Sequence, residues 1–342
     1  MSILDVNHMK SKIAALAYSS PERRVFNSEI EKDLQLKNPH LHIPENLIEI
    51  TTGIQSRMFS AEDEYNSTLA AKAGLVLFDQ YNISPKDIDL LIFASAGQDL
   101  IEPATSHIVQ DILKTNCRVF DIKNACNGFI DALVIADSCI KSGLHKSILI
   151  VTGEASSKSI KWNLKDRTDL KNSFPGYTLG DMGTAVLVQP SNDDSGLVLS
   201  DCLNDSSKWG IGTLPAGGSR HPRGDEYTYF QGDGAGLKNS FEKIAPSFFS
   251  NFLSKNRINK DAIDYICIHQ VSDYYLKEMV ALLQIDDRKT IHTAKDFGNV
   301  AAATIPLQLA LLNGDKKLKK GDKILLVGLA GGVSIELVYF IW

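Results

Sequence analysis

The 342-residue sequence predicts an α/β protein of two related halves, stacked as a layered α-β-α-β-α sandwich. Three observations lead to this class. Two short segments occur twice, in the same order and at nearly the same offset. Their strand-length parts are continuous apolar runs, which are typical of strands buried on both faces. Helical patterns separate the strands, and that alternation is typical of parallel sheets covered by helices.

The first repeated segment reads as a polar turn, an Ile-Asp pair and a short strand. It occurs as Ile83–Phe93 and again as Ile258–Ile268, at an offset of 175 residues. The second is an apolar strand, Ser147–Val151, which corresponds to Lys323–Val327 at an offset of 176 residues. Two matches at nearly one offset predict a duplicated unit, with a first half over residues 1–190 and a second over residues 191–342.

Helical periodicity appears in the stretches between these strands. Apolar residues at helical spacing predict helices over Ser67–Gln80, Ala104–Leu113, Phe129–Lys141, Ser240–Ser254, Asp273–Leu283 and Ala302–Leu312. The Gly-rich stretch Gly210–Gly236 shows neither the helical nor the strand period. We predict that it is a long functional loop rather than a linker.

Composition excludes several classes of protein. Lys and Arg total 36 and Asp and Glu total 41, so the net charge of −5 leaves no basic surplus for nucleic-acid binding. Residues 1–8 lack the apolar stretch of a secretory signal, and no run approaches the ~18 apolar residues of a membrane span. The five cysteines form no Cys-x-x-Cys pair, which favours a reducing cytoplasm. The histidines have no metal-ligand spacing, so no metal site is expected.

Cys126 is the candidate nucleophile. Arg118–Ile122 reads as a strand, a tight turn follows, and Cys126 stands near the start of the next helix. The helix dipole and free amides there favour a thiolate and predict a lowered pKa for Cys126. A thiolate can attack a thioester carbonyl and hold the acyl group. From spacing alone, a buried structural cysteine fits equally well.

His269 and Asn299 are ambiguous when each is taken alone. His269 ends the predicted strand of the second repeat, where a histidine is more often a satisfied structural residue than a catalyst. Asn299 lies in Phe297–Val300 and could serve only as a cap for the helix that follows.

Six motifs occur in one order along the chain, and their context resolves this ambiguity. They are Thr52–Arg57, Asn124–Phe129, Gly180–Gly183, His269–Ser272, Phe297–Pro306 and Ala330–Gly332. Together they resemble the motifs of the 3-oxoacyl-acyl-carrier-protein synthase III (ketosynthase III) family, which are condensing enzymes of the thiolase superfamily. The resemblance spans residues ~10 to 342 and implies the thiolase fold, a duplicated five-layered sandwich, usually in a cytoplasmic homodimer.

The resemblance also implies a reaction. Cys126 would take an acyl group from an acyl-CoA or acyl-carrier-protein thioester, and the backbone amides of Cys126 and Gly331 would form the oxyanion hole. His269 and Asn299 would donate hydrogen bonds to the carbonyl of a second, malonyl-type thioester as it loses carbon dioxide. The resulting carbanion would attack the acyl group on Cys126. No permanently bound cofactor is implied, and acyl carrier protein is an expected partner.

Three departures from the family pattern favour a specialised pathway. His269–Ser272 reads His-Gln-Val-Ser where the family has His-Gln-Ala-Asn. The segment Pro44–Thr51 lacks the Trp and Arg with which housekeeping members hold the CoA adenine, so no CoA-binding residue is assigned. The third departure is Glu102, a carboxylate where housekeeping members place an apolar residue of the acyl pocket.

Glu102 lies in Ile101-Glu102-Pro103, which resembles an element of the relatives that join two acyl thioesters head to head in bacterial olefin biosynthesis. In those relatives the Glu reaches across the dimer as a base for the acyl α-carbon. The alternatives are a solvated loop residue or a first-turn Glu that favours the dipole of the Ala104 helix.

The leading interpretation is a ketosynthase III-like enzyme that performs Claisen condensation in fatty-acid-like or secondary-metabolite biosynthesis of polyketide type. Head-to-head condensation with Glu102 as base is one alternative, and acyl transfer from Cys126 to an alcohol or amine is another. A non-catalytic partner subunit of a condensing heterodimer is an alternative of a different class. The presence of Cys126, His269 and Asn299 counts against that last role.

Overall fold

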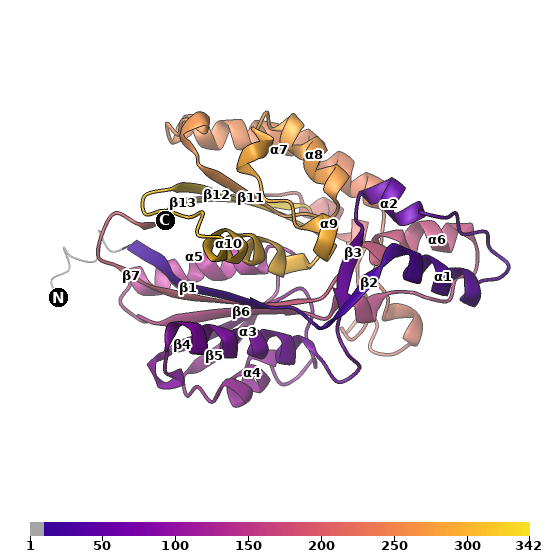
Figure 1. Ribbon diagram of the computed structural model, residues 1–342, viewed down its shortest axis with the longest axis horizontal. Helices are drawn as coiled ribbons and strands as arrows, with labels where there is room; N and C mark the ends of the chain where they lie inside the picture. The colour runs from indigo at the N-terminus through magenta and orange to yellow at the C-terminus, as the bar shows by residue number, and fades with distance from the viewer. Residues whose placement is uncertain (1–9) are drawn as a thin grey trace.

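The structure, a computed structural model, describes residues 10–342 and is a five-layered sandwich (Figure 1). A five-stranded sheet and a four-stranded sheet enclose one layer of helices, and further helices cover the two outer faces. The middle layer holds α5 (Gly128–Lys141) and α10 (Thr304–Gly314). The outer layers hold α3 (Asn66–Tyr81) and α4 (Thr105–Leu113) on one side, and α7 (Gly234–Lys255) and α8 (Asp273–Leu282) on the other. This arrangement confirms the predicted fold class.

Both sheets are mixed rather than purely parallel, which corrects one expectation. The first has the order β1-β7-β6-β4-β5, and the second has the order β11-β12-β13-β8. The strands of the first sheet are β1 (Lys10–Ser19), β4 (Leu90–Ala94), β5 (Arg118–Ile122), β6 (Ile148–Glu154) and β7 (Met182–Ser191). Those of the second are β8 (Gly196–Asn204), β11 (Tyr265–Ile268), β12 (Lys323–Ala330) and β13 (Ser334–Ile341). The turn between β12 and β13 is too short for a crossover helix, so these two strands must pair antiparallel.

The duplicated segments occupy equivalent places in the two sheets. β4 pairs in parallel with β6 through Leu90 and Ile148, and β11 pairs in parallel with β12 through Tyr265 and Ile324. The aspartate of each Ile-Asp pair ties the two strands at their start. Asp89 accepts the Ser147 amide at 3.2 Å, and Asp264 accepts the Lys323 amide at 2.8 Å. The predicted internal repeat is therefore a structural repeat.

Alternate residues of the strands enter different cores. Leu90 and Ile92 of β4 pack into the core between the two sheets, whereas Leu91 and Phe93 pack against α3 and α4. On the second sheet, the outer core lies under α7 and α8. Burial on both faces explains why the strands read as continuous apolar runs.

The six predicted helices are all present, with small shifts at their ends. The largest shift is in α7, which begins at Gly234 inside the Gly-rich stretch because the Asp233 side chain accepts the Gly236 amide. The rest of that stretch is mostly irregular and includes the short strands β9 (Gly212–Thr213) and β10 (Gln231–Gly232).

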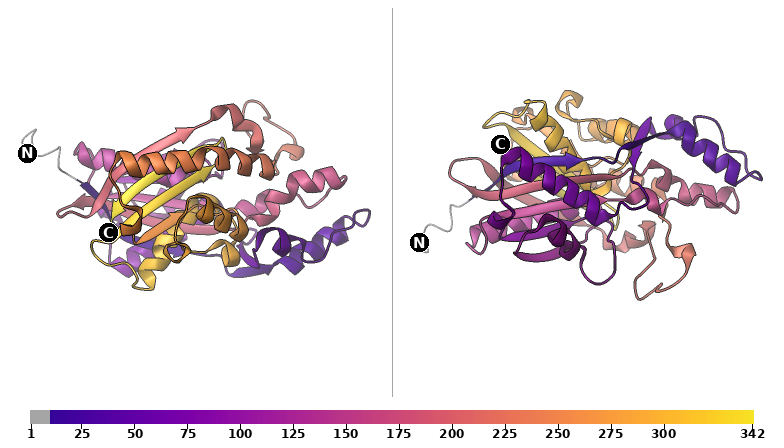
Figure 2. Two further views of the ribbon diagram at one scale, coloured as in Figure 1. Left: turned by 90° about the horizontal axis from the view of Figure 1, so that it is seen from above. Right: turned by 60° about the horizontal axis from the view of Figure 1, so that its bottom comes forward.

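A side lobe at one end of the sandwich has no counterpart in the predicted elements (Figure 2). It has its own small core, formed around Val25, Ile30 and Tyr177. Its elements are β2 (Arg23–Phe26), α1 (Asn27–Lys37), α2 (Leu47–Thr52), β3 (Ser56–Phe59) and α6 (Arg167–Ser173).

Two expectations concern the limits of the chain and its halves. Residues 1–8, on which the absence of a secretory signal rests, lie outside the described residues. Within residues 10–342, no helix combines the length and the apolarity needed to cross a membrane. The first sheet ends its last strand at Ser191 and the second begins at Gly196. The division after residue 190 stays a prediction.

Candidate active site

The Cys126 turn, residues 124–127, connects β5 to α5. Ala125 adopts a φ of 45°, an uncommon left-handed conformation for a residue with a side chain. The turn closes through hydrogen bonds from the Asn127 amide to the Asn124 carbonyl, at 3.0 Å, and from the Gly128 amide to the Ala125 carbonyl, at 3.3 Å. This geometry places Cys126 just before the first turn of α5, as the sequence predicts.

The predicted thiolate character of Cys126 is wrong for the free protein. Burial raises the pKa of Cys126 to about 12, and the neighbouring Glu154 carboxyl adds to the shift. The dipole at the start of a helix favours a thiolate, but loss of hydration outweighs it here. Cys126 is therefore a neutral thiol near pH 7.

Glu154 is a residue of this region that sequence reasoning missed. It ends β6, is completely buried, and accepts the Ala96 amide at 2.8 Å. Its other side-chain oxygen has no hydrogen-bond partner within residues 10–342, and burial raises the pKa of Glu154 to about 8. The signal in the sequence was an acidic residue at the end of an otherwise apolar strand.

An acidic pair, the partly buried Asp131 and the buried Glu336, contacts the Cys126 turn through Asn124. Asn124 Nδ2 donates to Asp131 Oδ2 at 2.7 Å and to Glu336 Oε1 at 3.2 Å. Burial and the hydrogen-bonded Asp131 carboxyl raise the pKa of Glu336 to about 8, and burial also raises the pKa of Asp131. Because Asp131 lies on α5 and Glu336 on β13, the pair ties the turn to the second sheet. Sequence reasoning missed both residues.

His269 follows β11 and is held through its backbone. Its amide donates to the Val327 carbonyl of β12 at 2.9 Å. The side chain is buried, and neither ring nitrogen has a hydrogen-bond partner within residues 10–342. Burial lowers the pKa of His269 to about 4, so the imidazole is neutral near pH 7. The alternative of a satisfied structural histidine is wrong.

Asn299 lies after the short helix α9 (Ala294–Phe297) and is anchored on both sides. Its amide donates to the Thr178 carbonyl at 2.8 Å, and its carbonyl accepts the Gly180 amide at 3.0 Å. Its side-chain Oδ1 accepts the Ala301 amide at 3.0 Å, so the capping contact considered from the sequence is present. That contact occupies the acceptor end of the side chain and leaves the Nδ2 donor for a ligand.

The Gly180–Gly183 motif has a steric explanation. Any side-chain carbon at Gly180 would collide with the Phe297 carbonyl, and one at Gly183 would collide with the Leu69 carbonyl of α3. Gly298 adopts a φ of 66° and lies against the Thr178 carbonyl. Gly180 and Gly298 let the segment that carries Asn299 approach the first half closely, and Gly183 lets β7 pack against α3.

Contacts among the elements bring the three motif residues to one region between the sheets. The 3-10 turn Ala301–Ala303, which follows Asn299, packs against α5 and β6. Gly328 of β12 lies directly against Asn127 in the Cys126 turn, and the adjacent Val327 holds His269. These contacts bring the segments that carry Cys126, His269 and Asn299 together, and the catalytic roles of the three residues stay predictions.

Gly331 and Glu102 are less closely tied to this region. Gly331 lies in the turn between β12 and β13, beside the Gly212 carbonyl, and its role in an oxyanion hole stays a prediction.

Glu102 is exposed on the loop before α4. The amides at the start of α4, on Thr105 and Ser106, donate to Asp121 at 2.7 and 2.8 Å. Asp121 rather than Glu102 therefore compensates this helix terminus, and the base role of Glu102 across a dimer stays a prediction.

An open groove of about 490 Å³ lies near Gly331 and continues along the Gly-rich stretch. Lys208 and Asp233 supply its charged side chains. Its other lining residues are Asn172, Ser207, Gly210, Ile211, Thr213, Gln231 and Gly232.

Comparisons with known proteins agree with the fold and the motifs. Residues 120–206 match the family 3-oxoacyl-[acyl-carrier-protein] synthase III, and residues 253–342 match the C-terminal region of that family. The chain is 30% identical to β-ketoacyl-[acyl-carrier-protein] synthase III of Clostridioides difficile, over 95% of this chain and 97% of that protein. It is 29% identical to the enzyme of the same name from Rickettsia massiliae, over 98% of this chain and all of that protein.

Solved structures extend the likeness to three dimensions. Xanthomonas campestris OleA with bound lauric acid and lauroyl-CoA superposes with a TM-score of 0.88 at 25% identity, over 97% of this chain and 99% of that one. Cerulenin-bound OleA superposes with a TM-score of 0.87 at 24% identity, over 98% and 99% of the two chains. The chain belongs to the 3-oxoacyl-[acyl-carrier-protein] synthase III family of the thiolase superfamily, and it is a ketosynthase III-like condensing enzyme, an acyltransferase.

Proposed function

We propose that this enzyme loads an acyl group onto Cys126 from an acyl-CoA or acyl-carrier-protein thioester and then extends it by decarboxylative Claisen condensation. The observation that carries the proposal is His269, a buried neutral imidazole whose ring nitrogens have no protein partner within residues 10–342, in the neighbourhood of the Cys126 turn. A buried polar group without a partner is costly, and a substrate carbonyl would satisfy it.

The first step is acyl transfer. Cys126 Sγ bonds to the thioester carbonyl carbon, the bond to the departing sulfur breaks, and that thiolate receives the proton of the Cys126 thiol. The amides of Cys126 and Gly331 are the proposed donors to the tetrahedral oxygen. Because the pKa of Cys126 is about 12, we expect proton loss to accompany attack rather than precede it.

The second step forms the carbon–carbon bond. His269 and Asn299 Nδ2 donate to the thioester carbonyl of a malonyl-type substrate, and the enolate that they stabilise forms as carbon dioxide leaves. Its α-carbon attacks the acyl carbonyl on Cys126, the bond to Sγ breaks, and Cys126 regains a proton from solvent. A histidine with a pKa of about 4 is a weak base but a competent hydrogen-bond donor. This favours decarboxylation over proton abstraction by His269.

The remaining parts of the proposal concern substrate entry and assembly. The groove beside Gly331 can receive the arm of a thioester, and lauroyl-CoA in the similar OleA structure supports an acyl-CoA substrate. Exposed Leu100 and Ile101, next to Glu102, support a homodimer in which this loop meets a partner. Five free cysteines support work in the cytoplasm. We propose no permanently bound cofactor, and a role in fatty-acid or related secondary-metabolite synthesis.

The test combines two mass measurements. The enzyme is incubated with a panel of acyl-CoA and acyl-carrier-protein thioesters, and the mass added at Cys126 is read on the intact protein. The acylated enzyme then receives a malonyl thioester, and the 3-oxoacyl product and carbon dioxide are quantified. If the acyl group moved to an alcohol or amine and no carbon dioxide formed, the reaction would be simple acyl transfer rather than condensation. No adduct with any donor would point to a non-catalytic partner subunit.

A further inference from the structure

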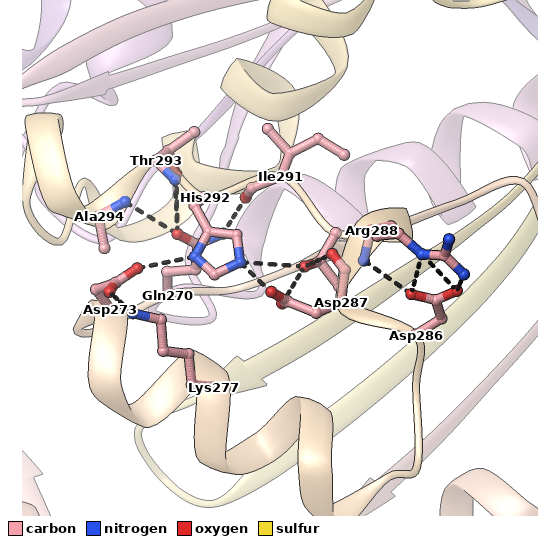
Figure 3. Close-up of polar contacts among 11 residues, drawn as sticks. Gln270, Asp273, Lys277, Asp286, Asp287, Arg288, Ile291, His292, Thr293 and Ala294 are labelled. Atoms are coloured by element: carbon pink, nitrogen blue, oxygen red, sulfur yellow. Dashed lines mark hydrogen bonds and ion pairs between the residues drawn. The ribbon is translucent and has the colours of Figure 1, made fainter.

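His292 is the centre of a charged network that the proposed reaction does not use (Figure 3). Its Nδ1 lies 2.8 Å from Asp273 Oδ1, and its Nε2 lies 2.9 Å from Asp287 Oδ1. Lys277 completes the network with a 2.8 Å ion pair to the other oxygen of Asp273. Only an imidazole protonated on both nitrogens can donate to both carboxylates at once. The geometry therefore calls for a charged His292.

This network lies where the two proposed donors are joined. Asp273 begins α8, four residues after His269, and Ser272 caps that helix by accepting the Tyr275 amide at 3.1 Å. His292 precedes α9, which leads to Asn299. We call residues 269–273 and 290–299 the His–Asn junction. The Asp273–His292 contact links its two strands of chain.

A second, uncharged set of contacts lies beneath the first. Gln270, which directly follows His269, accepts the amides of Thr293 and Ala294, both at 2.9 Å, through its Oε1 atom. Its Nε2 atom donates to the Ile291 carbonyl. Gln270 and the amides that it binds do not ionise, so pH can affect these bonds only through neighbouring contacts, whereas His292 is partly exposed and titrates.

We propose that His292 is a positioning residue that, in its charged form, holds the segment leading to Asn299 against the segment leading from His269. The catalytic consequence of this role depends on the proposed function. Loss of the charge should remove the outer contacts of the junction, so that the Gln270 bonds alone hold the two segments together and open more often. Misplacement of a catalytic group by about 1 Å can cost roughly a hundredfold in rate, so even a small shift of Asn299 is consequential.

The charges around His292 set the direction of its pH response. Burial opposes its charge, but the hydrogen bonds to Asp273 on α8 and Asp287 before α9 outweigh burial and raise the pKa of His292. The pKa values of Asp273 and Asp287 are lowered, chiefly through His292 and, for Asp273, also through Lys277, although burial opposes the shift. The contact of His292 with both carboxylates is thus complete at pH values above the lowered pKa values of Asp273 and Asp287 and below the raised pKa of His292. It is lost as pH rises through that upper limit.

The experiment uses the full-length enzyme and three variants. His292→Gln removes the charge, His292→Lys keeps a charge that does not titrate near neutral pH, and Arg288→Gln is the matched control. Arg288 forms an exposed ion pair with Asp286 at 2.6 Å in the same stretch, but it does not touch the junction. Three measurements are made from pH 6 to pH 9. They are the rate of Cys126 acylation, the rate of condensation, and the hydrogen-exchange protection factors of the Thr293 and Ala294 amides.

At pH 6 we expect His292→Gln to lower condensation roughly ten- to a hundredfold with unchanged acylation, and to lower the protection of both amides. His292→Lys should retain more condensation activity than His292→Gln and lose the part of the wild-type pH dependence that His292 causes. Arg288→Gln should behave like the wild type. Wild-type condensation and protection in His292→Gln across the pH range would overturn the proposal. If the wild type loads Cys126 but never condenses, the proposed function fails, and the protection factors alone decide the role of His292.

Discussion

Acidic residues lie near both the Cys126 turn and the His–Asn junction, but their pKa values are shifted in opposite directions. Around Cys126, burial raises the pKa values of Glu154 and Glu336 to about 8, so these carboxyls are protonated near neutral pH. At the junction, the buried Asp273 and the exposed Asp287 beside it have lowered pKa values because they pair with His292. The nucleophile region is thus kept uncharged and the donor region is held by charge. Rising pH should disturb the two regions through different groups.

The largest expected effect comes from Cys126→Ala. No other cysteine occupies a strand–turn–helix position, so the variant should form no stable acyl-enzyme with any thioester. Intact-protein mass spectrometry measures the adduct. An adduct at the wild-type level in the Ala variant would show that Cys126 is not the nucleophile. The comparison of the two regions would then have no bearing on the reaction.

The next largest effect separates the two regions. His269→Ala or Asn299→Ala should slow condensation by about 10²–10³, by analogy with the loss of an oxyanion-hole donor, while Cys126 acylation is largely spared. Single-turnover measurements of each half-reaction test this. Equal loss of both half-reactions would mean that the junction activates the thiol or supports the fold instead.

A smaller effect concerns the protonated carboxyls near Cys126. Glu154 and Glu336 keep a proton in the folded state up to about pH 8, whereas the unfolded chain releases it near 4.5. Because the folded state then binds more protons, the free energy of unfolding should fall as pH rises from 5 to 8. The slope is up to about 1.4 kcal/mol per pH unit for each group. The slope should level off above pH 8.

Glu154→Gln and Glu336→Gln should each reduce that slope in urea unfolding at pH 5, 6, 7 and 8, because Gln cannot ionise. The same change at the exposed Glu62 serves as the control. An unchanged slope in both buried variants would show that these carboxyls are already ionised in the folded enzyme, and the contrast between the two regions would disappear.

The smallest expected effect on decarboxylative condensation is that of Glu102→Gln. This residue lies in neither region and is exposed in the single chain. If it acts as a base across a dimer, the variant should lose the joining of two simple acyl thioesters and keep Cys126 acylation. Malonyl extension should be nearly unaffected, because decarboxylation supplies the carbanion. Product analysis with both substrate types measures this, and unchanged products throughout would leave Glu102 as a loop residue.

Much of the fold could be predicted because its signals are local. Apolar runs mark the buried strands, helical spacing marks the six main helices, and the Ile-Asp repeat marks the two halves. The side lobe was missed because its short strands and helices carry too little periodicity. The antiparallel partners β1, β7 and β8 were missed because their pairing is a long-range property that no short window contains, whereas β13 pairs locally with β12 through a short turn that the sequence analysis did not identify.

The features of the candidate site could likewise be predicted where their signal is local and not where it depends on distant contacts. Motif context singled out Cys126, His269 and Asn299, and the segments that carry them lie against one another in the structure. The pKa of Cys126 was mispredicted because the helix start is visible in sequence, whereas the desolvation and the Glu154 carboxyl are not. Asp131, Glu336 and His292 acquire their roles from partners outside their own helix or strand, so their residue types alone gave no signal.

The pairing of Asn299 with Thr178 and Gly180 has a consequence for how the enzyme folds. This bridge joins segments some 120 residues apart, so a large loop-closure entropy opposes its formation until both sheets exist. We therefore expect Asn299 to reach its place late, when one sheet docks on the other. Neither half expressed alone can present this donor, and mild denaturant that separates the sheets should abolish condensation while helices and strands persist.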